Sequence, residues 1–388
     1  MTSPLPLALY IHWPFCLSKC PYCDFNSHVR ETIPQERFTQ ALRDELRYEA
    51  ALLTQDAPRH LVSIFFGGGT PSLMQPEAVH QLIEDARQLF PSVNDLEVTL
   101  EANPTSVEAD KFRAFAQAGV NRLSLGVQSL HDADLATLGR QHSAQQALTA
   151  LELGRRLFPR LSFDLIYARP GQTEAHWQAE LRTALALAAD HLSLYQLTIE
   201  PGTVFETRHR RGALTLPEDD LAARLYEMTR HEAATYGLRD YEISNYAIPG
   251  AESRHNLTYW HYNDYLGIGP GAHSRLTRQG QLYATRRHRA PEPWAERVAH
   301  YGHGTRIQEA LTPEMKAREA LLMGLRLREG INKAHFTQRT GLPLQDCLDP
   351  VILQACLEED YLQQDEHTLR ATESGRLLLE AMLSQLVL

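Results

Sequence analysis

Short apolar runs alternate with amphipathic segments through the first two-thirds of the chain. The runs are rich in aliphatic and aromatic residues and are bounded by turn residues, which is typical of buried strands. Strands are therefore predicted at Leu7–Trp13, Leu61–Phe66, Leu96–Leu100, Arg122–Leu125, Leu161–Ile166 and Leu192–Leu197. Between the runs, apolar residues recur with the helical period. Helices are predicted at Gln35–Leu53, Pro76–Leu89, Val107–Ala118, Ala144–Leu157, Glu174–Ala188 and Glu218–Tyr236.

Six βα units in a row predict parallel strands that are joined by right-handed crossovers. Six units are fewer than the eight that close a TIM barrel. The predicted fold class is therefore α/β, an open (β/α)6 part-barrel, and a doubly wound open sheet is the alternative.

Beyond Tyr236 the alternation fades, and the chain changes character again near Leu311. A further strand is predicted within Tyr241–Tyr246 and a glycine-rich loop over Gly267–Ser274. The last part predicts helices at Pro313–Leu327, Lys333–Thr340 and Asp346–Glu359, a hairpin at Tyr361–Leu369 and a final helix at Thr372–Leu386. This order predicts a small, mostly helical, winged-helix-like domain. We expect a core over 1–237, a connecting region over 238–300 and a C-terminal domain over 301–388.

Composition and charge exclude some classes of function. The 388 residues are 43% hydrophobic and 22% charged, as in an ordinary globular protein. A net charge of −10 argues against broad nucleic-acid binding, which needs a basic surface. Met1–Leu9 lacks the basic start and apolar core of a signal peptide, and no run reaches the ~20 apolar residues of a membrane span. We therefore expect a cytoplasmic protein whose thiols stay reduced.

Three cysteines follow the first predicted strand in the pattern C-x-x-x-C-x-x-C, at Cys16, Cys20 and Cys23. Three soft ligands on one loop suit zinc or an iron–sulfur cluster. Structural zinc needs a fourth ligand, for which His12 or His28 is near in sequence. A [4Fe–4S] cluster on three thiolates leaves one iron open to a ligand, and redox or structural thiols are a third possibility. The distant Cys347 and Cys356 are interpreted as buried or incidental thiols.

Polar residues, glycines and prolines follow each predicted strand, where βα barrels place their active sites. These stretches are the cysteine loop, Gly67–Pro71, Glu101–Pro104, Gly126–Ser129, Tyr167–Gly171 and Thr198–Pro201. The glycine run lets the backbone approach a ligand closely, or serves a tight turn; it lacks the ending of a phosphate loop. Glu101 could accept from an ammonium or hydroxyl group, or could pair with a helix N-terminus.

At these residues the chain resembles the radical S-adenosylmethionine (SAM) superfamily. The flanks Tyr-x-His-x-Pro-Phe-Cys and Cys-Asp-Phe-Asn resemble the relatives of oxygen-independent coproporphyrinogen III dehydrogenase. That dehydrogenase has another cysteine two residues after the third, where this chain has Phe25, so the resemblance is to the heme chaperone HemW family. The resemblance implies a [4Fe–4S] cluster on Cys16, Cys20 and Cys23. It implies SAM contacts at Tyr10, Tyr22, Gly68, Gly69, Thr70, Glu101, Gln128, Arg140, Asp164, Gln196 and His273.

The segment from His255 also resembles the HemW family, through its H-N-x-x-Y-W motif. The resemblance implies heme binding at His255, Asn256, Tyr259 and Trp260. A neutral imidazole is a common axial ligand to heme iron, so replacing His255 with Ala is expected to weaken heme binding. The alternative is a satisfied structural histidine. Two basic clusters, His209–Arg211 and Arg286–Arg289, are interpreted as solvated loops or as sites for propionates.

Two functions follow from the resemblance. The first is a heme chaperone that binds heme and passes it to acceptor proteins, such as respiratory proteins at the cytoplasmic membrane, which would entail peripheral membrane association. The second is SAM-dependent oxidative decarboxylation of coproporphyrinogen III. Phe25, the H-N-x-x-Y-W motif and the nine residues before Tyr10, in place of the longer dehydrogenase segment, favour the chaperone. The scaffold is capable of SAM cleavage, and the resemblance assigns no catalytic residue.

Overall fold

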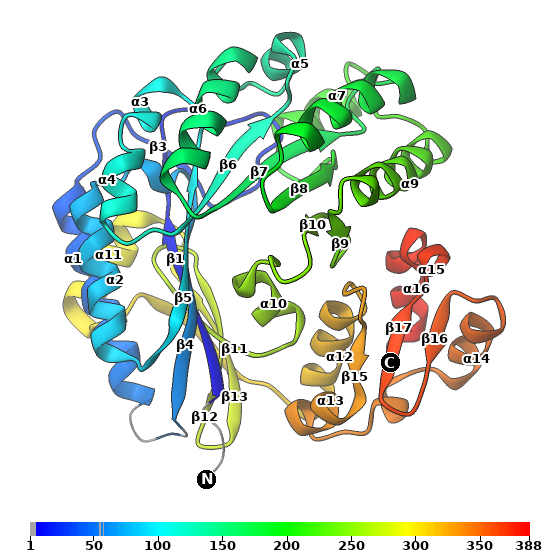
Figure 1. The fold of residues 1–388 in the computed structure, drawn as a ribbon. Coiled ribbons are helices and arrows are strands. Elements are labelled where there is room, and N and C mark those ends of the chain that lie inside the picture. The colour runs from blue at the N-terminus through cyan, green and yellow to red at the C-terminus, as the bar shows by residue number, and fades with distance from the viewer. Residues whose placement is uncertain (1–4, 54–55, 57) are drawn as a thin grey trace.

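A twelve-stranded sheet organises the part of the chain that the computed structural model describes, residues 5–53, 56 and 58–388 (Figure 1). Its strand order is β14-β13-β12-β11-β1-β4-β5-β6-β7-β8-β10-β9. The six central strands are β1 (Leu5–Trp13), β4 (Arg59–Gly68), β5 (Ser92–Ala102), β6 (Arg122–Gln128), β7 (Arg160–Tyr167) and β8 (His191–Gln196). Met1–Leu9 is the segment in which no signal peptide is predicted, and its residues 1–4 lie outside the described residues.

The six central strands pair in parallel, in the order in which they occur in the chain. Their order never reverses, so the right-handed crossovers place the helices on one face, the outside of the curved sheet in Figure 1. The helices between and after them are α1 (Gln35–Leu53), α2 (Pro76–Leu89), α3 (Ser106–Ala109), α4 (Phe112–Gln117), α5 (Asp132–Thr137), α6 (Ala144–Leu157), α7 (Glu174–Leu187), α8 (Val204–Arg210) and α9 (Asp219–Thr235). The open (β/α)6 part-barrel is confirmed, and the doubly wound alternative is excluded.

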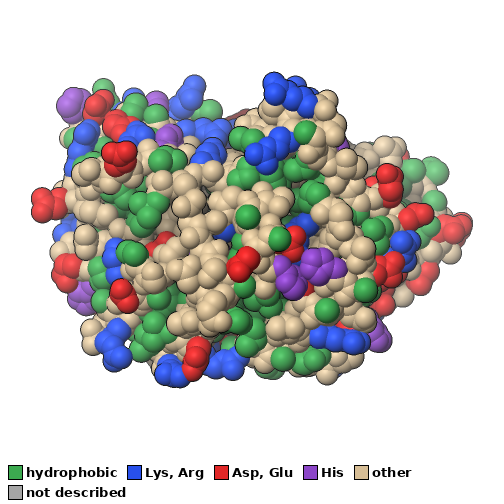
Figure 2. Space-filling view, turned by 90° about the horizontal axis from the view of Figure 1, so that it is seen from above, with side chains coloured by type: hydrophobic (Ala, Val, Ile, Leu, Met, Phe, Trp, Pro, Cys, Tyr) green, Lys and Arg blue, Asp and Glu red, His purple; other side chains and the backbone are tan. Residues whose placement is uncertain are grey.

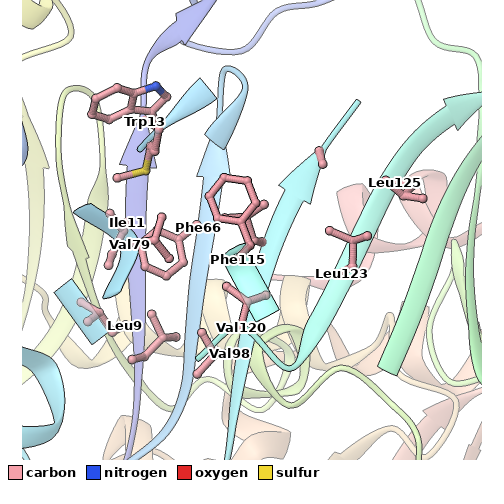
Figure 3. Close-up of a cluster of buried hydrophobic side chains, with 14 of the residues drawn as sticks. Leu9, Ile11, Trp13, Phe66, Val79, Val98, Phe115, Val120, Leu123 and Leu125 are labelled. Atoms are coloured by element: carbon pink, nitrogen blue, oxygen red, sulfur yellow. The ribbon is translucent and has the colours of Figure 1, made fainter. Parts of the chain in front are cut away.

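Large apolar side chains fill the space between the sheet and its helices. Figure 3 shows Ile11 of β1, Phe66 of β4 and Leu123 of β6 in one buried layer with Val79 of α2 and Phe115 of α4. All five are completely buried. Burial of each such side chain contributes about 1.5–3 kcal/mol, which explains why the apolar runs located the strands so well.

One predicted helix is wrong in detail. The periodicity over Val107–Ala118 predicts a single helix, but the chain forms α3 and α4 with a turn at Asp110 and Lys111. The buried carboxylate of Glu108 on α3 accepts hydrogen bonds from the Ser72 hydroxyl and from the backbone N–H of Asn103. This anchoring to the strand-end loops holds α3 apart from the helix that follows.

The sheet continues beyond the six predicted strands on both sides. On one side lie β11 (Asp264–Ile268), parallel to β1, and the antiparallel strands β12 (His273–Arg278), β13 (Gln281–Arg287) and β14 (Thr305–Ala310). On the other, β9 (Arg239–Asp240) and β10 (Asn245–Ala247) extend β8. The helices α10 (Arg254–Trp260) and α11 (Pro291–Tyr301) complete this region.

The glycine-rich loop predicted over Gly267–Ser274 is shorter than expected, because β11 and β12 take two residues at each end and leave a turn at 269–272. Gly269 in that turn has a φ of +98°, and a Cβ there would lie 2.4 Å from the backbone oxygen of His12. The glycine therefore lets the β11–β12 turn approach the end of β1, rather than forming a long loop.

The C-terminal part contains α12 (Pro313–Gly324), α13 (Lys333–Thr340), α14 (Pro350–Glu358), α15 (Glu373–Leu377) and α16 (Leu379–Leu386). This part also contains a small antiparallel sheet of β15 (Ile331–Asn332), β17 (Thr368–Ala371) and β16 (Leu362–Gln364). The predicted winged-helix-like arrangement is thus present, although the last helix breaks at Leu378. Its hydrophobic cluster includes Cys347 and Cys356 and also Tyr262 and Leu282, so a domain boundary near 300 stays a prediction.

Acidic side chains gather at the outer end of the C-terminal part, at the right of Figure 2. The exposed residues there include Glu358, Glu359, Asp360, Asp365 and Glu366. Such a surface repels the phosphates of nucleic acid. Within the described ranges, none of the helices has the length and apolar character needed to cross a bilayer.

Candidate functional site

The carboxyl ends of the central strands surround a cavity of about 550 Å³. Most of the residues that the sequence singled out line this one cavity. They are Cys16, Cys20, Cys23, Tyr22, Gly68, Gly69, Thr70, Glu101, Gln128, Arg140, Asp164 and Gln196. The prediction that the strand-end loops meet in one place therefore agrees with the structure.

Backbone hydrogen bonds fix the cysteine loop between the ends of β1 and β4. The Gly69 N–H donates to the carbonyl of Trp13, and the Thr70 N–H donates to that of Phe15. A Cβ on Gly69 would lie only 2.7 Å from the Phe15 carbonyl oxygen. Gly68 has a φ of +114° and lies against the ring of His12. The glycine run is therefore required by the approach of the cysteine loop itself, in addition to any ligand.

The three sulfurs fit a metal that is bound through thiolates on one loop. All three cysteines are free thiols, and two accept hydrogen bonds: Cys16 from the Thr70 hydroxyl at 3.3 Å and Cys20 from the Arg140 guanidinium at 3.4 Å. Burial raises the pKa of the Cys16 and Cys23 thiols. A bound cation would offset that cost, because it favours the thiolate.

The histidines near the cysteines do not complete a zinc site. His12 Nδ1 is 2.9 Å from the Tyr10 hydroxyl, and its Nε2 is 2.9 Å from the carbonyl oxygen of Asn26, so both ring nitrogens are in use. Burial also lowers the pKa of His12 to about 4. His28 forms a long contact of 3.4 Å with the Asn26 side chain and does not line the cavity. Neither of these two histidines therefore adds a fourth ligand to the three sulfurs, and three thiolates are what a cluster with one open iron needs.

Arg140 and Asn103 connect two of the cysteines through side chains. The Asn103 amide donates to the Thr70 hydroxyl at 3.4 Å, and Arg140 donates to the Asn103 amide oxygen at 2.5 Å and to the Gly126 carbonyl at 2.8 Å. A chain of hydrogen bonds thus runs from Cys16 to Cys20. Sequence reasoning missed Asn103 as a site residue, although its position after a strand was a usable signal.

Two buried carboxyl groups lie in the same cavity, Glu101 on β5 and Asp164 on β7, the two strands that flank β6. Burial, with a smaller effect of Asp164, raises the pKa of Glu101 to about 8. Burial also raises the pKa of Asp164 to about 6, and a hydrogen bond from Ser193 opposes this. Glu101 accepts from the Gly68 backbone N–H rather than lying at a helix N-terminus. Such a pair is ready to receive a cationic or hydroxyl-bearing ligand.

Two strand-end residues adopt left-handed backbone conformations. Gln128 has a φ of +71°, and Ala168 has a φ of +55°. Non-glycine residues in this region cost free energy and cluster at functional sites. Ala168 thus adopts a backbone shape that glycine would adopt without strain.

Two predicted SAM contacts lie outside the cavity. Tyr10 is beneath it, where its ring stacks on Phe65 and its hydroxyl bonds to His12. His273 is exposed at the first position of β12 and does not line the cavity. For both residues the structure offers no direct approach to a ligand in this site.

The predicted heme residues on α10 do not surround a common cavity. His255 is buried, with Nδ1 2.9 Å from the Ser63 hydroxyl and Nε2 2.6 Å from the Tyr259 hydroxyl. Its ring stacks on Phe65, and burial lowers its pKa to about 3. Both nitrogens are engaged, so the geometry supports the structural histidine. Asn256 approaches the hydroxyl of Tyr241 instead.

The two basic clusters differ in exposure. Arg210 and Arg211 are exposed at the end of α8, as expected of a solvated loop. Arg287, in contrast, is completely buried and pairs with Glu45 and Glu49 of α1. The interpretation of Arg286–Arg289 as a solvated face or a propionate site is therefore wrong at Arg287, which joins β13 to α1.

Comparison with known proteins agrees with this architecture. A sequence profile of the Radical SAM superfamily matches residues 10–184, and a profile of the HemN C-terminal domain matches residues 311–378. The solved structure of coproporphyrinogen III oxidase (HemN) from Escherichia coli covers 98% of this chain and 90% of its own, with a TM-score of 0.81 and 22% sequence identity. At that identity the likeness concerns the fold.

Two curated relatives match nearly the whole chain. The mitochondrial radical S-adenosyl methionine domain-containing protein 1 of Bos taurus is 42% identical over 99% of this chain and 89% of its own length. The heme chaperone HemW of Escherichia coli (strain K12) is 38% identical over 97% of both chains. Because identity at this level extends over nearly the full length, the chain belongs to the HemW family of the radical SAM superfamily.

Proposed function

We propose that this protein binds heme and passes it to acceptor proteins, on a scaffold that holds a [4Fe–4S] cluster and SAM. The observation that carries the proposal is the near full-length relation to heme chaperones of the HemW family, 38% identical in the case cited above. Phe25, which is 61% exposed beside the cysteine loop, supports it, because this position offers no fourth thiol. The proposed acceptors are respiratory proteins at the cytoplasmic membrane, to which a cytoplasmic chaperone would attach peripherally.

Different residues of the chain would hold the cluster and SAM. Cys16, Cys20 and Cys23 would bind the cluster, while Thr70 and Arg140 donate to two of the sulfurs and favour their thiolate form. Glu101 and Asp164 would receive the cationic and hydroxyl groups of SAM. When both are bound, cluster and SAM together supply reductive cleavage of a sulfonium bond. The protein's part is to orient the ligand and to exclude water.

The second candidate is SAM-dependent decarboxylation of coproporphyrinogen III, which the fold of the HemN structure favours. An anaerobic titration of reconstituted protein with heme, paired with a decarboxylase assay, separates the two. We expect about one heme per chain and no decarboxylated product. Clear product would favour the enzyme, and failure of the wild-type protein to bind heme would refute the chaperone.

The same preparation tests the cluster. Replacing Cys16, Cys20 or Cys23 with Ala should abolish cluster assembly, because each removes one of only three protein ligands. Iron and inorganic sulfide are measured after anaerobic reconstitution, with Cys347→Ala as the matched control. A metal without inorganic sulfide in the wild-type protein would indicate zinc instead.

A further inference from the structure

A second cavity, of about 410 Å³, lies at the C-terminal end of α10, between this helix and the C-terminal part. Figure 1 shows α10 between the barrel strands and α12, and the two helices are in contact. The wall of this cavity is largely apolar and includes Trp260, Leu327, Ile331 and Phe336. Ligand pockets in proteins have volumes of about 300–1,000 Å³ and walls of this kind.

Two histidines, His261 and His335, line this cavity, and each keeps one ring nitrogen without a partner in the described part of the chain. His261 Nε2 lies 2.6 Å from a carboxylate oxygen of Glu329, which leaves Nδ1 available. A histidine that binds a metal typically donates its other N–H to a carboxylate, which fixes the ring and makes the free nitrogen more basic. His261 has this arrangement, whereas both nitrogens of His255 are occupied.

The apolar cavity adjoins a larger polar one of about 950 Å³, and His261, Leu327 and Glu329 line both. Five arginines and five acidic residues line the polar cavity. Among the described residues, Arg239 forms no ion pair, and Arg370 bonds only to the uncharged Gln363. Guanidinium groups without a carboxylate partner are suited to bind ligand carboxylates through paired hydrogen bonds.

We propose that heme binds across these adjoining cavities, with His261 Nδ1 as axial ligand and the propionates directed to Arg239 and Arg370; this rests on the proposed function. An iron porphyrin needs an apolar slot, a nitrogen donor and cations at its carboxylate edge. The adjoining cavities together provide all three. The H-N-x-x-Y-W motif then contributes its last residue, Trp260, to the wall, while His255 holds α10 in the barrel.

The test is an anaerobic titration of the reconstituted full-length protein with hemin, followed by absorption and electron paramagnetic resonance spectra. His261→Ala should remove the spectrum of an iron–imidazole bond and weaken binding by more than tenfold. Glu329→Gln should weaken it by about tenfold, because it removes only the carboxylate behind the ligand. His367→Ala, an exposed histidine in the same part of the chain that does not line either cavity, should behave as wild type.

The propionate contacts have their own test. The double variant Arg239→Gln, Arg370→Gln should weaken hemin binding by about five- to tenfold without a change of the iron–imidazole spectrum. Hemin dimethyl ester, which lacks the carboxylates, should bind the wild type and this variant equally.

Three outcomes would overturn the assignment. One is an unchanged affinity and spectrum in His261→Ala; another is loss of the spectrum in His335→Ala while His261→Ala retains it. The third is loss of the iron–imidazole spectrum in a folded His255→Gln protein while His261→Ala keeps that spectrum. This result would make His255 the axial ligand, as expected from the motif. Circular dichroism establishes that each variant is folded. If the wild type binds no hemin, the proposed function itself fails.

Discussion

The buried carboxyl groups of Glu101 and Asp164 are a prominent feature of the cavity at the carboxyl ends of the strands, where we propose that SAM binds. With pKa values near 8 and 6, at least one of them holds a proton at neutral pH in the ligand-free protein. A cationic ligand favours the ionised forms, so it must expel that proton on binding. The site is therefore coupled to pH through its own side chains.

We expect SAM to bind more tightly as the pH rises from about 6 to 8 and to release protons within this range. The sign follows from the raised pKa values: at pH 6 the protons must be displaced, and above pH 8 Glu101 is already ionised. Calorimetric titration in buffers of different ionisation enthalpy measures the release. Glu101→Gln should reduce it, and heats that do not depend on the buffer would contradict the idea.

The close approach of the cysteine loop to Gly69 provides a second prediction. Gly69→Ala should prevent cluster assembly, because the new Cβ would lie 2.7 Å from the Phe15 carbonyl and push the cysteine loop away. Iron and sulfide content after reconstitution is the measurement. Gly212→Ala is the control: its φ of +69° is also left-handed, but nothing lies within 4 Å of the added carbon. That change costs about 1 kcal/mol and should leave the cluster intact.

Among the elements, α10 lies inside the part-barrel, below the carboxyl ends of the central strands (Figure 1). The helix is capped at its N-terminus by Ser253, whose side chain accepts a hydrogen bond from the Asn256 N–H. From there His255 reaches Ser63 of β4, and the helix contacts β1, β4 and β11. The helix therefore covers the inner face of these three strands.

His255 should contribute to stability in a manner that depends on pH. Its pKa is about 3 in the folded state and near 6.5 when unfolded, so its contribution is present above pH 6.5 and is lost as the pH falls toward 3. His255→Gln should flatten that part of the profile. Tyr259→Phe should cost about 1–2 kcal/mol of unfolding free energy by leaving Nε2 without a partner. Denaturant titrations at several pH values measure both effects. If the unfolding free energy of His255→Gln depends on pH in the same way as that of the wild type, the assignment is contradicted.

The central strands and most of their helices were predictable from their apolar periodicity, because their apolar side chains all pack in one layer between the sheet and the helices. Leu9, Phe66 and Leu123 face that layer wherever the rest of the chain lies. The cysteines, glycines and Glu101 were predictable because parallel strands bring their carboxyl ends together.

Contacts between distant segments were not predictable in the same way. The pairing of β11 with β1, the buried Arg287 between Glu45 and Glu49, and the bond between His255 and Ser63 depend on residues far apart in the chain. No periodicity encodes such contacts. The motif resemblance implied a heme ligand at His255, where packing occupies both ring nitrogens. Residue type suggested a solvated charge at Arg287, which packing buries.

For the whole molecule, one carboxylate links the barrel to the C-terminal part. Asp240 of β9 pairs with Arg230 of α9, with Arg328 after α12 and with Arg376 of α15. Asp240 itself is buried, and the Arg376 side chain is only 2% exposed. Removing one partner from such a buried network leaves charges without compensation.

Asp240→Asn should lower the unfolding free energy by about 3 kcal/mol and separate the melting of the C-terminal part from that of the barrel. Differential scanning calorimetry measures this as a second transition. Asp220→Asn, on the exposed face of α9, is the matched control and should melt as wild type. A single, unshifted transition in Asp240→Asn would show that other contacts hold the two parts together.

The position of β1 also has a consequence for biogenesis. This first strand lies between β4 and β11, and the Asn26 side chain, close behind the cysteines, donates to the carbonyls of Pro270 and Arg289. During translation the thiols emerge from the ribosome more than two hundred residues ahead of these anchors. Iron delivery to a finished site must therefore follow synthesis of β11, and nascent chains arrested earlier would present unprotected sulfhydryls to oxidants.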